Sequence, residues 1–259
     1  MFGLRGLLTL SRMKNLLLAA VAACVLSAAG CGKSDTGPKP IRVGTEAAYV
    51  PFEFQEGGEI KGFDADLIRA VGREIGRPVD LQNSEFQGLV PGLKTDRYDA
   101  VISCVTITEE RKKEVDFSDP YYDAGQIVAV RADETRIKSK EDLKGKRIGA
   151  QSNTTGLDQA KTMGGSDVKT YDDVNMAFQD LANNQIDAVI NDEPVSRRLA
   201  AVKPGFKVVG EVFTKEQYGI VVKKGDAALL AEINKALKKL RDSGELQKLK
   251  EKWITSPAK

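Results

Sequence analysis

The stretch Ser103-Cys104-Val105-Thr106-Ile107-Thr108-Glu109-Glu110-Arg111-Lys112-Lys113 decides how the rest of the chain is interpreted. It follows Tyr-Asp-Ala-Val-Ile at 98–102, a short apolar run typical of a buried strand. Thr108 suits the N-cap of a helix whose first turn holds Glu109 and Glu110, because acids are favourable at the positive end of the helix dipole. The stretch therefore predicts the end of a strand, a turn and the start of a helix.

Arg111 does not suit that first helical turn. A cation there is unfavourable unless an anion lies nearby, and a guanidinium is shaped to bind a carboxylate through two parallel hydrogen bonds. Together with free backbone N–H groups and two hydroxyl groups, Arg111 indicates a carboxylate receptor. A strand–turn–helix junction with a solvated arginine explains the same spacing, and the stretch alone leaves both interpretations open.

The composition sets limits on function. The 259 residues are 41% hydrophobic and 29% charged, which is typical of a soluble globular protein and enough for two modest domains or one large one. There is no histidine, which excludes a histidine-based triad, proton shuttle or metal site. Beyond residue 30, 36 basic residues face 37 acidic ones, so no nucleic-acid partner is expected. We expect no cofactor and no metal.

The N-terminus is typical of an export signal. Basic residues precede an apolar run at 16–29 that ends in small residues, so residues 1–30 are predicted to be a signal peptide. The run is short for a membrane-spanning helix. Small residues before Cys31 resemble a bacterial lipobox, with Ala28 in the usual position of leucine, and predict that Cys31 carries a lipid. Cys24 is a rival, although apolar residues follow it.

Residues 31–40 are polar and rich in glycine, proline and lysine, as expected of a flexible tether between the lipid and the folded part. Once Cys31 is acylated and Cys24 removed, Cys104 is the remaining thiol. A disulfide is then excluded, and the fold must be held by its hydrophobic core.

The pattern beyond residue 40 predicts an α/β fold in two lobes. Strands are expected at 41–44, 79–81 and 98–102, with helices at 64–77 and 86–94 between them, so the strands are parallel. The second half repeats this order, with strands at 147–150, 168–171 and 186–190 and helices at 154–163 and 174–181. Asp-Ala-Val-Ile occurs in both halves, at 99–102 and 187–190, and polar residues follow each copy.

Those polar residues should share a cleft, because ligands of open α/β sheets bind beyond the carboxyl ends of the strands. Chain crossovers are expected near 119–125 and 217–219, followed by C-terminal helices at 229–240 and 246–253. We predict lobe 1 at 41–125 and 218–259, lobe 2 at 126–217, and two crossover strands as a hinge.

From Ile41 to Trp253 the chain resembles the polar amino-acid group of extracytoplasmic solute-binding proteins that serve ABC importers, nearest to the glutamine-, arginine- and histidine-binding types. The residues that carry the resemblance include Gly-Phe-Asp-Ala-Asp-Leu at 62–67 and the stretches 44–54, 106–111, 116–122 and 143–149. It implies a periplasmic-binding-protein fold of type II, whose two α/β lobes close on the ligand about crossover strands.

The resemblance also implies residue roles at the ligand's α-carbon. Arg111 would bind the α-carboxylate, helped by the backbone N–H groups of Thr106 and Thr155. Asp192 would bind the α-ammonium from the other lobe, together with the Thr106 hydroxyl and a backbone carbonyl. That carbonyl belongs to Ser103 or Cys104. Asp192 could instead cap the helix that begins at the next residue.

For the ligand side chain, the resemblance implies that Tyr49 and Phe86 form an aromatic sandwich, while Glu46 and Gln151 contact its far end. Tyr49 and Phe86 could also be ordinary core residues. Relatives commonly have aspartate in place of Glu46 and a smaller residue in place of Cys104. Some glutamine binders have histidine where this chain has Asn191. The acid and the aromatic faces favour a basic side chain, with glutamine as the next candidate.

We therefore expect a lipid-anchored, extracytoplasmic, monomeric receptor that binds a free L-amino acid and delivers it to the membrane subunits of an ABC importer, and no enzyme. The alternative on the same fold resembles the cyclohexadienyl dehydratases. That chemistry needs an acid poised near neutral pH in a dry cleft, for which Glu46 is the candidate.

Overall fold

The structure is a computed structural model that describes residues 37–164 and 167–255. The predicted signal peptide, Cys31 and most of the predicted tether lie outside the described residues. The described residues from Pro38 onward form one compact unit. Within the described part, no helix is both long enough and apolar enough to cross a membrane.

The first sheet has three parallel strands at one side and an antiparallel pairing at the other. Its order is β5-β1-β6-β15-β7, from β1 (Ile41–Thr45), β5 (Val79–Asn83), β6 (Ala100–Val101), β7 (Val115–Phe117) and β15 (Val221–Lys223). β1 runs parallel to β5 and β6, whereas β15 runs antiparallel to β6 and β7. The parallel order predicted for the first half of the chain is thus confirmed for its three strands.

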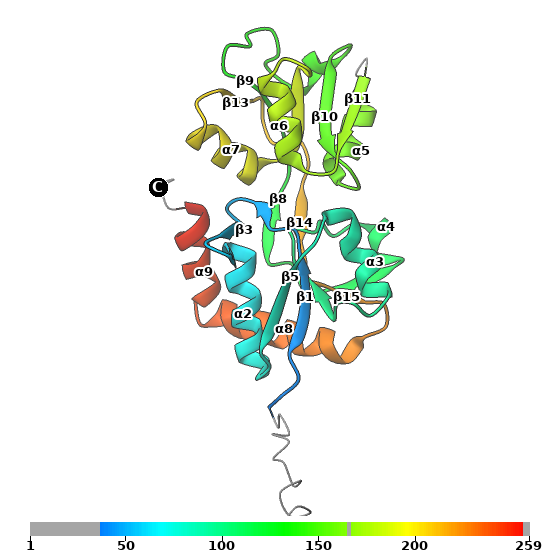
Figure 1. Cartoon of the computed structure of the whole chain (residues 1–259), viewed down its shortest axis with the longest axis vertical. Coiled ribbons are helices and arrows are strands. Elements are labelled where there is room, and N and C mark those ends of the chain that lie inside the picture. The colour runs from blue at the N-terminus through cyan, green and yellow to red at the C-terminus, as the bar shows by residue number, and fades with distance from the viewer. Residues whose placement is uncertain (1–36, 165–166, 256–259) are drawn as a thin grey trace, which may run out of the picture. The chain divides into compact units, whose positions relative to one another are not determined.

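Helices cover both faces of this sheet (Figure 1). They are α2 (Phe63–Ile75), α3 (Leu89–Lys94), α4 (Glu109–Lys112), α8 (Ala227–Asp242) and α9 (Glu245–Lys250). The apolar stripe of α2 is buried in the same core cluster as that of α8, and α3 packs with the opposite face. α2 ends at Ile75 because Gly76 adopts a left-handed conformation (φ 77°) and donates its N–H to the carbonyl of Arg73.

The second sheet repeats this arrangement. Its order is β11-β10-β12-β9-β13, from β9 (Gln126–Arg131), β10 (Arg147–Gln151), β11 (Asp167–Tyr171), β12 (Ala188–Asp192) and β13 (Phe206–Val209). β10 is parallel to β11 and β12, and β9 is antiparallel to β12 and β13. The helices are α5 (Thr155–Thr162), α6 (Val174–Ala182) and α7 (Glu193–Val202), with a 3₁₀ turn at Lys140–Leu143.

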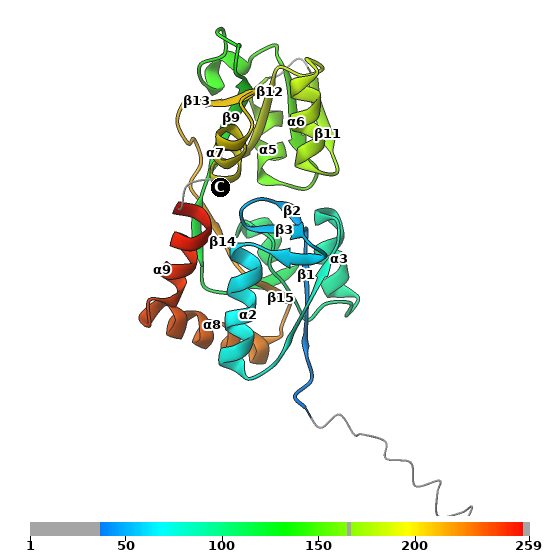
Figure 2. The same ribbon diagram turned by 60° about the vertical axis from the view of Figure 1, so that its left-hand side comes forward.

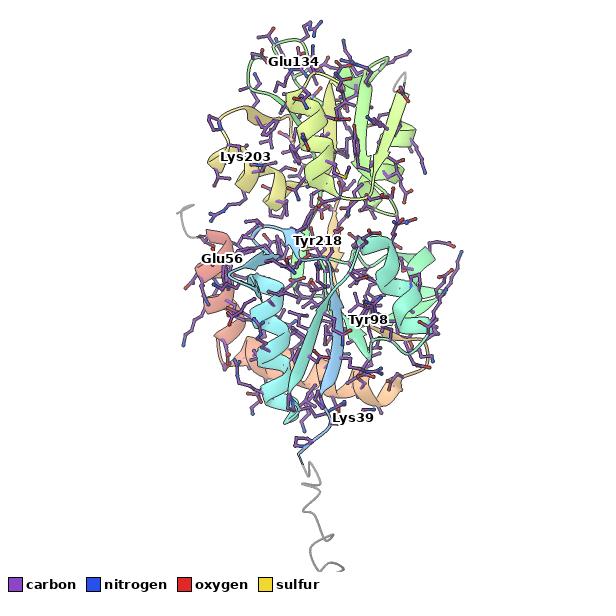
Figure 3. The ribbon with its side chains drawn as sticks, in the orientation of Figure 1. Lys39, Glu56, Tyr98, Glu134, Lys203 and Tyr218 are labelled. Carbon is purple, nitrogen blue, oxygen red and sulfur yellow. The ribbon has the colours of Figure 1, made fainter. Side chains whose placement is uncertain are left out.

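Two further strands lie where the chain crosses from one sheet to the other. β8 (Tyr122–Ala124) and β14 (Glu216–Tyr218) form an antiparallel ladder in which Tyr218 lies opposite Tyr122. The two rings are stacked with centroids 5.7 Å apart. Tyr218 is fully buried and lies between the lobes in Figure 3. We call residues 41–125 and 218–255 lobe 1 and residues 126–217 lobe 2, following the limits predicted above.

Several predicted elements differ from the observed ones. Residues 48–61, for which no strand was predicted, form a three-stranded meander of β2 (Ala48–Tyr49), β3 (Glu53–Glu56) and β4 (Glu59–Lys61). Gly57 and Gly58 close its second hairpin with positive φ angles of 62° and 82°, which glycine adopts without strain. β2 and β3 lie at the end of lobe 1 that faces lobe 2 (Figure 2).

Four other predictions were wrong in their limits. The strand expected at 98–102 is ordered as β6 over two residues only, and the one expected at 186–190 is shifted to β12, which places Asn191 and Asp192 inside the strand. The helix expected at 86–94 begins as a 3₁₀ turn, Phe86–Gly88, before α3. The last helix continues beyond α9 as a π-helical turn, Glu251–Thr255.

Candidate ligand-binding site

The ten residues predicted for the site line one pocket between the lobes: Glu46, Tyr49, Phe86, Ser103, Cys104, Thr106, Arg111, Gln151, Thr155 and Asp192. The side chains that line this pocket nearly fill it and leave a cavity of about 20 Å³. The polar groups of the pocket consequently bond one another, and several of these bonds join the two lobes.

Arg111 is positioned by the helix cap that the sequence predicts. The Thr108 hydroxyl accepts the backbone N–H of Arg111 at 3.1 Å and so begins α4. The guanidinium donates from Nη1 to the carbonyl of Thr106 (2.9 Å) and from Nη2 to the carbonyl of Asn153 in lobe 2 (2.8 Å). It also lies over the ring of Phe86, 5.7 Å from the centroid. These contacts fix the plane of a five-donor group beside the pocket.

Asp192 supplies an acid from the opposite lobe. Its carboxylate accepts the hydroxyls of Tyr218 (2.7 Å) and Tyr49 (2.9 Å) and the side-chain amide of Gln126. Asp192 is at the N-cap position of α7, but its side chain makes no capping hydrogen bond, so the capping role considered above is wrong. Burial raises the pKa of Asp192 to about 6, and the donated hydroxyls oppose that rise.

Glu46 and Gln151 meet across the cleft. The Gln151 side-chain amide donates to both carboxylate oxygens of Glu46, at 2.8 and 2.9 Å, and to the carbonyl of Asp172. Glu46 is buried, with 7% of its surface exposed, and burial raises its pKa to about 7 while the Gln151 bond opposes the rise. The group is therefore poised between its neutral and charged forms near neutral pH.

The two aromatic residues of the proposed sandwich are placed differently. Tyr49 is buried and part of the main core cluster, and its hydroxyl reaches across the cleft to Asn191 (2.7 Å) as well as Asp192. Phe86 is half-buried at the start of the 3₁₀ turn, where Arg111 covers its ring. Tyr49 thus serves both the core and the pocket, which the sequence presented as alternatives.

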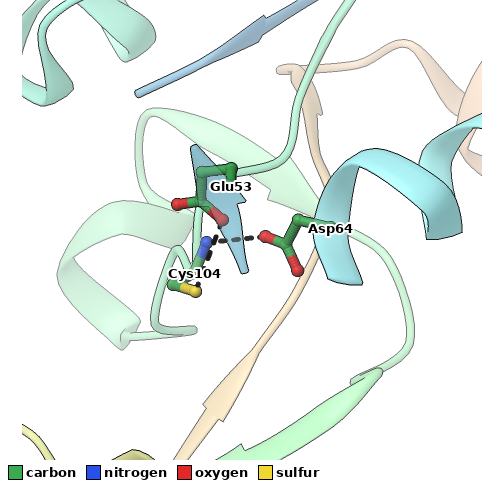
Figure 4. Close-up of side chains that lie close together, drawn as sticks. All are labelled: Glu53, Asp64 and Cys104. Carbon is green, nitrogen blue, oxygen red and sulfur yellow. Dashed lines mark hydrogen bonds between the residues drawn. The ribbon is translucent and has the colours of Figure 1, made fainter. Parts of the chain in front are cut away.

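Cys104 lies beside two buried acids, Glu53 and Asp64 (Figure 4), and lines the pocket together with Ser103. The Ser103 hydroxyl accepts the Glu46 N–H and donates to Glu53, both at 3.0 Å. The Cys104 N–H donates to Asp64 at 3.0 Å, with Cys104 in a left-handed conformation (φ 48°). Burial raises the pKa of Asp64 to about 6 and that of Glu53 well above its usual range. Two adjacent buried carboxyls cannot both be charged, so this pair holds a proton.

Other residues of the site were not predicted. Glu53, Gln126, Thr154, Gly156 and Asn191 also line the pocket, and Asn191 had been noted only as a departure from relatives. Glu216 reaches it through hydrogen bonds to Thr106 and Thr155. Glu53 lies in the family-like stretch 44–54, which was a usable signal. Glu216 lies between two polar residues, so no local pattern distinguishes it from a surface acid.

Comparisons with known proteins point to one family. Residues 41–256 match the bacterial extracellular solute-binding proteins, family 3. The arginine-binding extracellular protein ArtP of Bacillus subtilis (strain 168) is 35% identical over 94% of this chain and 99% of its own length. The L-cystine-binding protein TcyJ of Escherichia coli (strain K12) is 36% identical, over 82% of this chain and 81% of its own length.

Among solved structures, an ancestral arginine-binding protein bound to glutamine aligns with a TM-score of 0.81 at 43% identity, covering 84% of this chain and 98% of its own. The two-lobed fold of type II periplasmic binding proteins predicted from the sequence is thereby confirmed. This chain belongs to family 3 of the bacterial extracellular solute-binding proteins.

Proposed function

We propose that this chain is a lipid-anchored receptor that binds one polar amino acid, preferably a basic one, between its lobes and delivers it to an ABC importer. Membership of the family supports the coarser statement, an extracellular amino-acid-binding protein of an ABC importer. One observation carries the proposal: Arg111 from lobe 1 and Asp192 from lobe 2 line the same pocket. The two side chains match the carboxylate and the ammonium of an amino acid in charge.

The residues at the far end of the pocket favour a basic ligand. Glu46 is a buried acid whose direct partner from lobe 2 is the neutral amide of Gln151. A carboxylate in that position costs free energy unless it meets a cation or takes up a proton. An arginine, lysine or histidine side chain would supply the cation. The relatives described above are an arginine-binding protein, a cystine-binding protein and an ancestral arginine-binding protein bound to glutamine, so glutamine remains the second candidate.

Parallel titrations of wild type and Glu46→Gln with arginine and with glutamine test the ligand. With a basic ligand, Glu46→Gln leaves a buried cation unpaired and should weaken binding by roughly 2–5 kcal/mol. With glutamine, the change removes one amide hydrogen bond and should cost about 0.5–1.5 kcal/mol. Glu211→Gln is the control, because Glu211 is an exposed acid outside the pocket. A wild type that prefers glutamine would replace the basic assignment by the amide one.

The lipid anchor rests on the sequence around Cys31 and has its own test. Cys31→Ser should move the protein from the membrane fraction to the soluble extracytoplasmic fraction, and Cys24→Ser should leave it in the membrane. Retention of Cys31→Ser in the membrane would assign the anchor to Cys24 or to an uncleaved N-terminal segment.

The dehydratase alternative has one observation in its favour, since burial raises the pKa of Glu46 to about 7, a value suited to a general acid. Against it, the pocket carries opposite charges for both ends of a free amino acid, and the relatives described above are binding proteins. We expect no turnover of prephenate or arogenate. Turnover that is lost in Glu46→Gln would establish the enzyme instead.

A further inference from the structure

Glu216 joins the two lobes from the crossover strand β14. One of its oxygens, Oε2, accepts the hydroxyls of Thr155 (2.8 Å) and Thr106 (2.9 Å) and the amide of Gln126 (3.3 Å). The other, Oε1, accepts the hydroxyl of Thr214 at 2.8 Å. Four donors thus converge on one half-buried carboxylate.

These donors come from both sides of the cleft. Thr106 follows β6 of lobe 1 and pairs with Tyr218 through an isolated β-bridge. Thr155 is the first residue of α5 and Gln126 the first of β9, both in lobe 2. Because one oxygen atom receives donors from opposite lobes, this set of bonds requires the lobes to be close together. Hydrogen bonds to a charged acceptor are also the stronger kind.

The two threonines are those whose backbone N–H groups are proposed to bind the ligand's α-carboxylate beside Arg111. Glu216 accepts the proton of each hydroxyl, so the backbone N–H groups remain for the carboxylate, and the oxygen of the Thr106 hydroxyl can still accept from the ammonium as predicted above. The Gln126 amide that contacts Glu216 also donates to Asp192, the proposed ammonium-binding acid. One side chain of the crossover strand is therefore connected to both charged ends of the pocket.

We propose that Glu216 is a positioning residue that favours the closed cleft by bonding Thr106 and Thr155 from opposite lobes, without contacting the ligand. This inference rests on the proposed function, because it concerns the closure of the same site. It makes a specific statement about ligands: the contribution of Glu216 to affinity does not depend on the ligand side chain, whereas that of Glu46 does.

The test measures the dissociation constants of arginine and glutamine by calorimetry for wild type, Glu216→Ala and Glu216→Gln. Glu216→Ala should weaken both ligands by the same factor, roughly tenfold or more, from the loss of charged hydrogen bonds. Glu216→Gln keeps the size and one acceptor oxygen and should show a smaller, equally uniform loss. Glu211→Ala, at an exposed glutamate outside the pocket, is the control and should leave both affinities unchanged. Unchanged affinity in Glu216→Ala, or unequal factors for the two ligands, would overturn the proposal.

A double-mutant cycle separates closure from general destabilisation. Thr155→Val removes the hydroxyl and retains the backbone N–H, so its effect on affinity should largely disappear in the Glu216→Ala background. Additive losses of affinity would contradict the proposed role of Glu216 in closing the cleft.

The proposed function can fail separately. It fails when wild type binds none of the twenty amino acids. The role of Glu216 in closing the cleft is then tested by small-angle X-ray scattering without ligand. Glu216→Ala should have a larger radius of gyration than wild type. Equal radii would overturn it.

Discussion

The same arrangement of side chains occurs at the base of the sheet in each lobe, whereas the two sheets differ at the ends that line the pocket. In lobe 1, Arg42 donates to Asp99 from its backbone N–H (2.9 Å), Nε (3.2 Å) and Nη2 (2.6 Å). In lobe 2, Arg147 donates to Asp187 from the same three atoms at 2.9, 3.1 and 2.8 Å. Each aspartate begins a copy of Asp-Ala-Val-Ile, so one local sequence produces one local structure twice.

At the other end of the same strands the chemistry is opposite. The copy in lobe 1 leads to Ser103, Cys104 and the turn that places Arg111, whereas the copy in lobe 2 leads directly to Asn191 and Asp192. A common scaffold therefore presents a cation from one side of the cleft and an acid from the other. The base of each sheet should govern stability, and its carboxyl end should govern binding.

The largest expected effect comes from breaking the opposite charges. Arg111→Ala and Asp192→Ala should each weaken amino-acid binding by roughly 2–5 kcal/mol, because each removes one partner of a proposed ionic contact with the ligand. The losses should be similar, since the lobes contribute one charge each. Lys112→Ala, at an exposed cation on the same short helix as Arg111, is the control. Calorimetry that shows near wild-type affinity for Arg111→Ala would refute the assignment.

The acids that the two lobes bring to the pocket should be distinguishable by pH. The pKa of Glu46 is raised from 4.5 to about 7 and that of Asp192 from 3.8 to about 6, in both cases mainly by burial. The folded protein thus holds these protons more tightly than the unfolded chain. Each acid therefore reduces the free energy of unfolding as the pH rises from its unfolded pKa to its folded pKa.

Glu46→Gln should remove a loss of about 3 kcal/mol between pH 4.5 and 7, and Asp192→Asn a similar loss that is complete by about pH 6. Chemical denaturation across pH 4–8, without ligand, measures both. A wild type and a Glu46→Gln variant with parallel stability curves would show that the Glu46 carboxyl is not perturbed. Glu211→Gln, at an exposed glutamate outside the pocket, is the control, because Glu85 itself contributes to the raised pKa of Glu46.

Smaller effects are expected at the shared base. Asp99→Ala and Asp187→Ala each leave a backbone N–H of the neighbouring arginine without its side-chain acceptor and should cost about 1–3 kcal/mol of stability. The two losses should agree closely, and ligand affinity should not change. Asp133→Ala, at an aspartate with 87% of its side chain exposed, should have little effect. A clear inequality between Asp99→Ala and Asp187→Ala would show that the two bases are not equivalent.

The same comparison explains what the sequence could predict. The repeated Asp-Ala-Val-Ile and the apolar helix faces predict both sheets, because those signals lie within a few consecutive residues. The meander of β2, β3 and β4 was missed, since its pairing depends on the turn at Gly57 and Gly58 more than on an apolar run. Arg111 and the polar residues that follow each Asp-Ala-Val-Ile were indicated by the sequence pattern, and the remaining site residues came from the family resemblance. Their presence in one pocket agrees with that prediction, while their individual roles remain predictions.

Glu216 could not be predicted for a different reason. Two of its donors, Thr155 and Thr106, are 61 and 110 residues away in the sequence. They reach the same carboxylate because the two lobes meet there. Asp192 shows the reverse case, because its position before Glu193-Pro194 suggested a helix cap. Its carboxylate instead accepts hydrogen bonds from the buried hydroxyls of Tyr49 and Tyr218 and lies in the pocket.

The smallest effects should come from the two helix caps next to the site, one in each lobe. Thr108 accepts the N–H of Arg111 at 3.1 Å, and Thr154 accepts the N–H of Leu157 at 3.2 Å. Thr108→Ala and Thr154→Ala should each lower stability by about 1 kcal/mol, whereas the corresponding serine variants should retain it.

Their effects on binding should differ, because the helices differ in length. α4 has four residues and carries Arg111 on its first turn, so losing its cap should displace the guanidinium and weaken binding. α5 has eight residues, and its strand-side packing should hold Thr155 in place without the cap. Thermal unfolding and calorimetry on the four variants measure both quantities. Equal losses of affinity in Thr108→Ala and Thr154→Ala would mean that both caps position ligand-binding groups alike, and that the lobes are more symmetric in function than their opposite charges suggest.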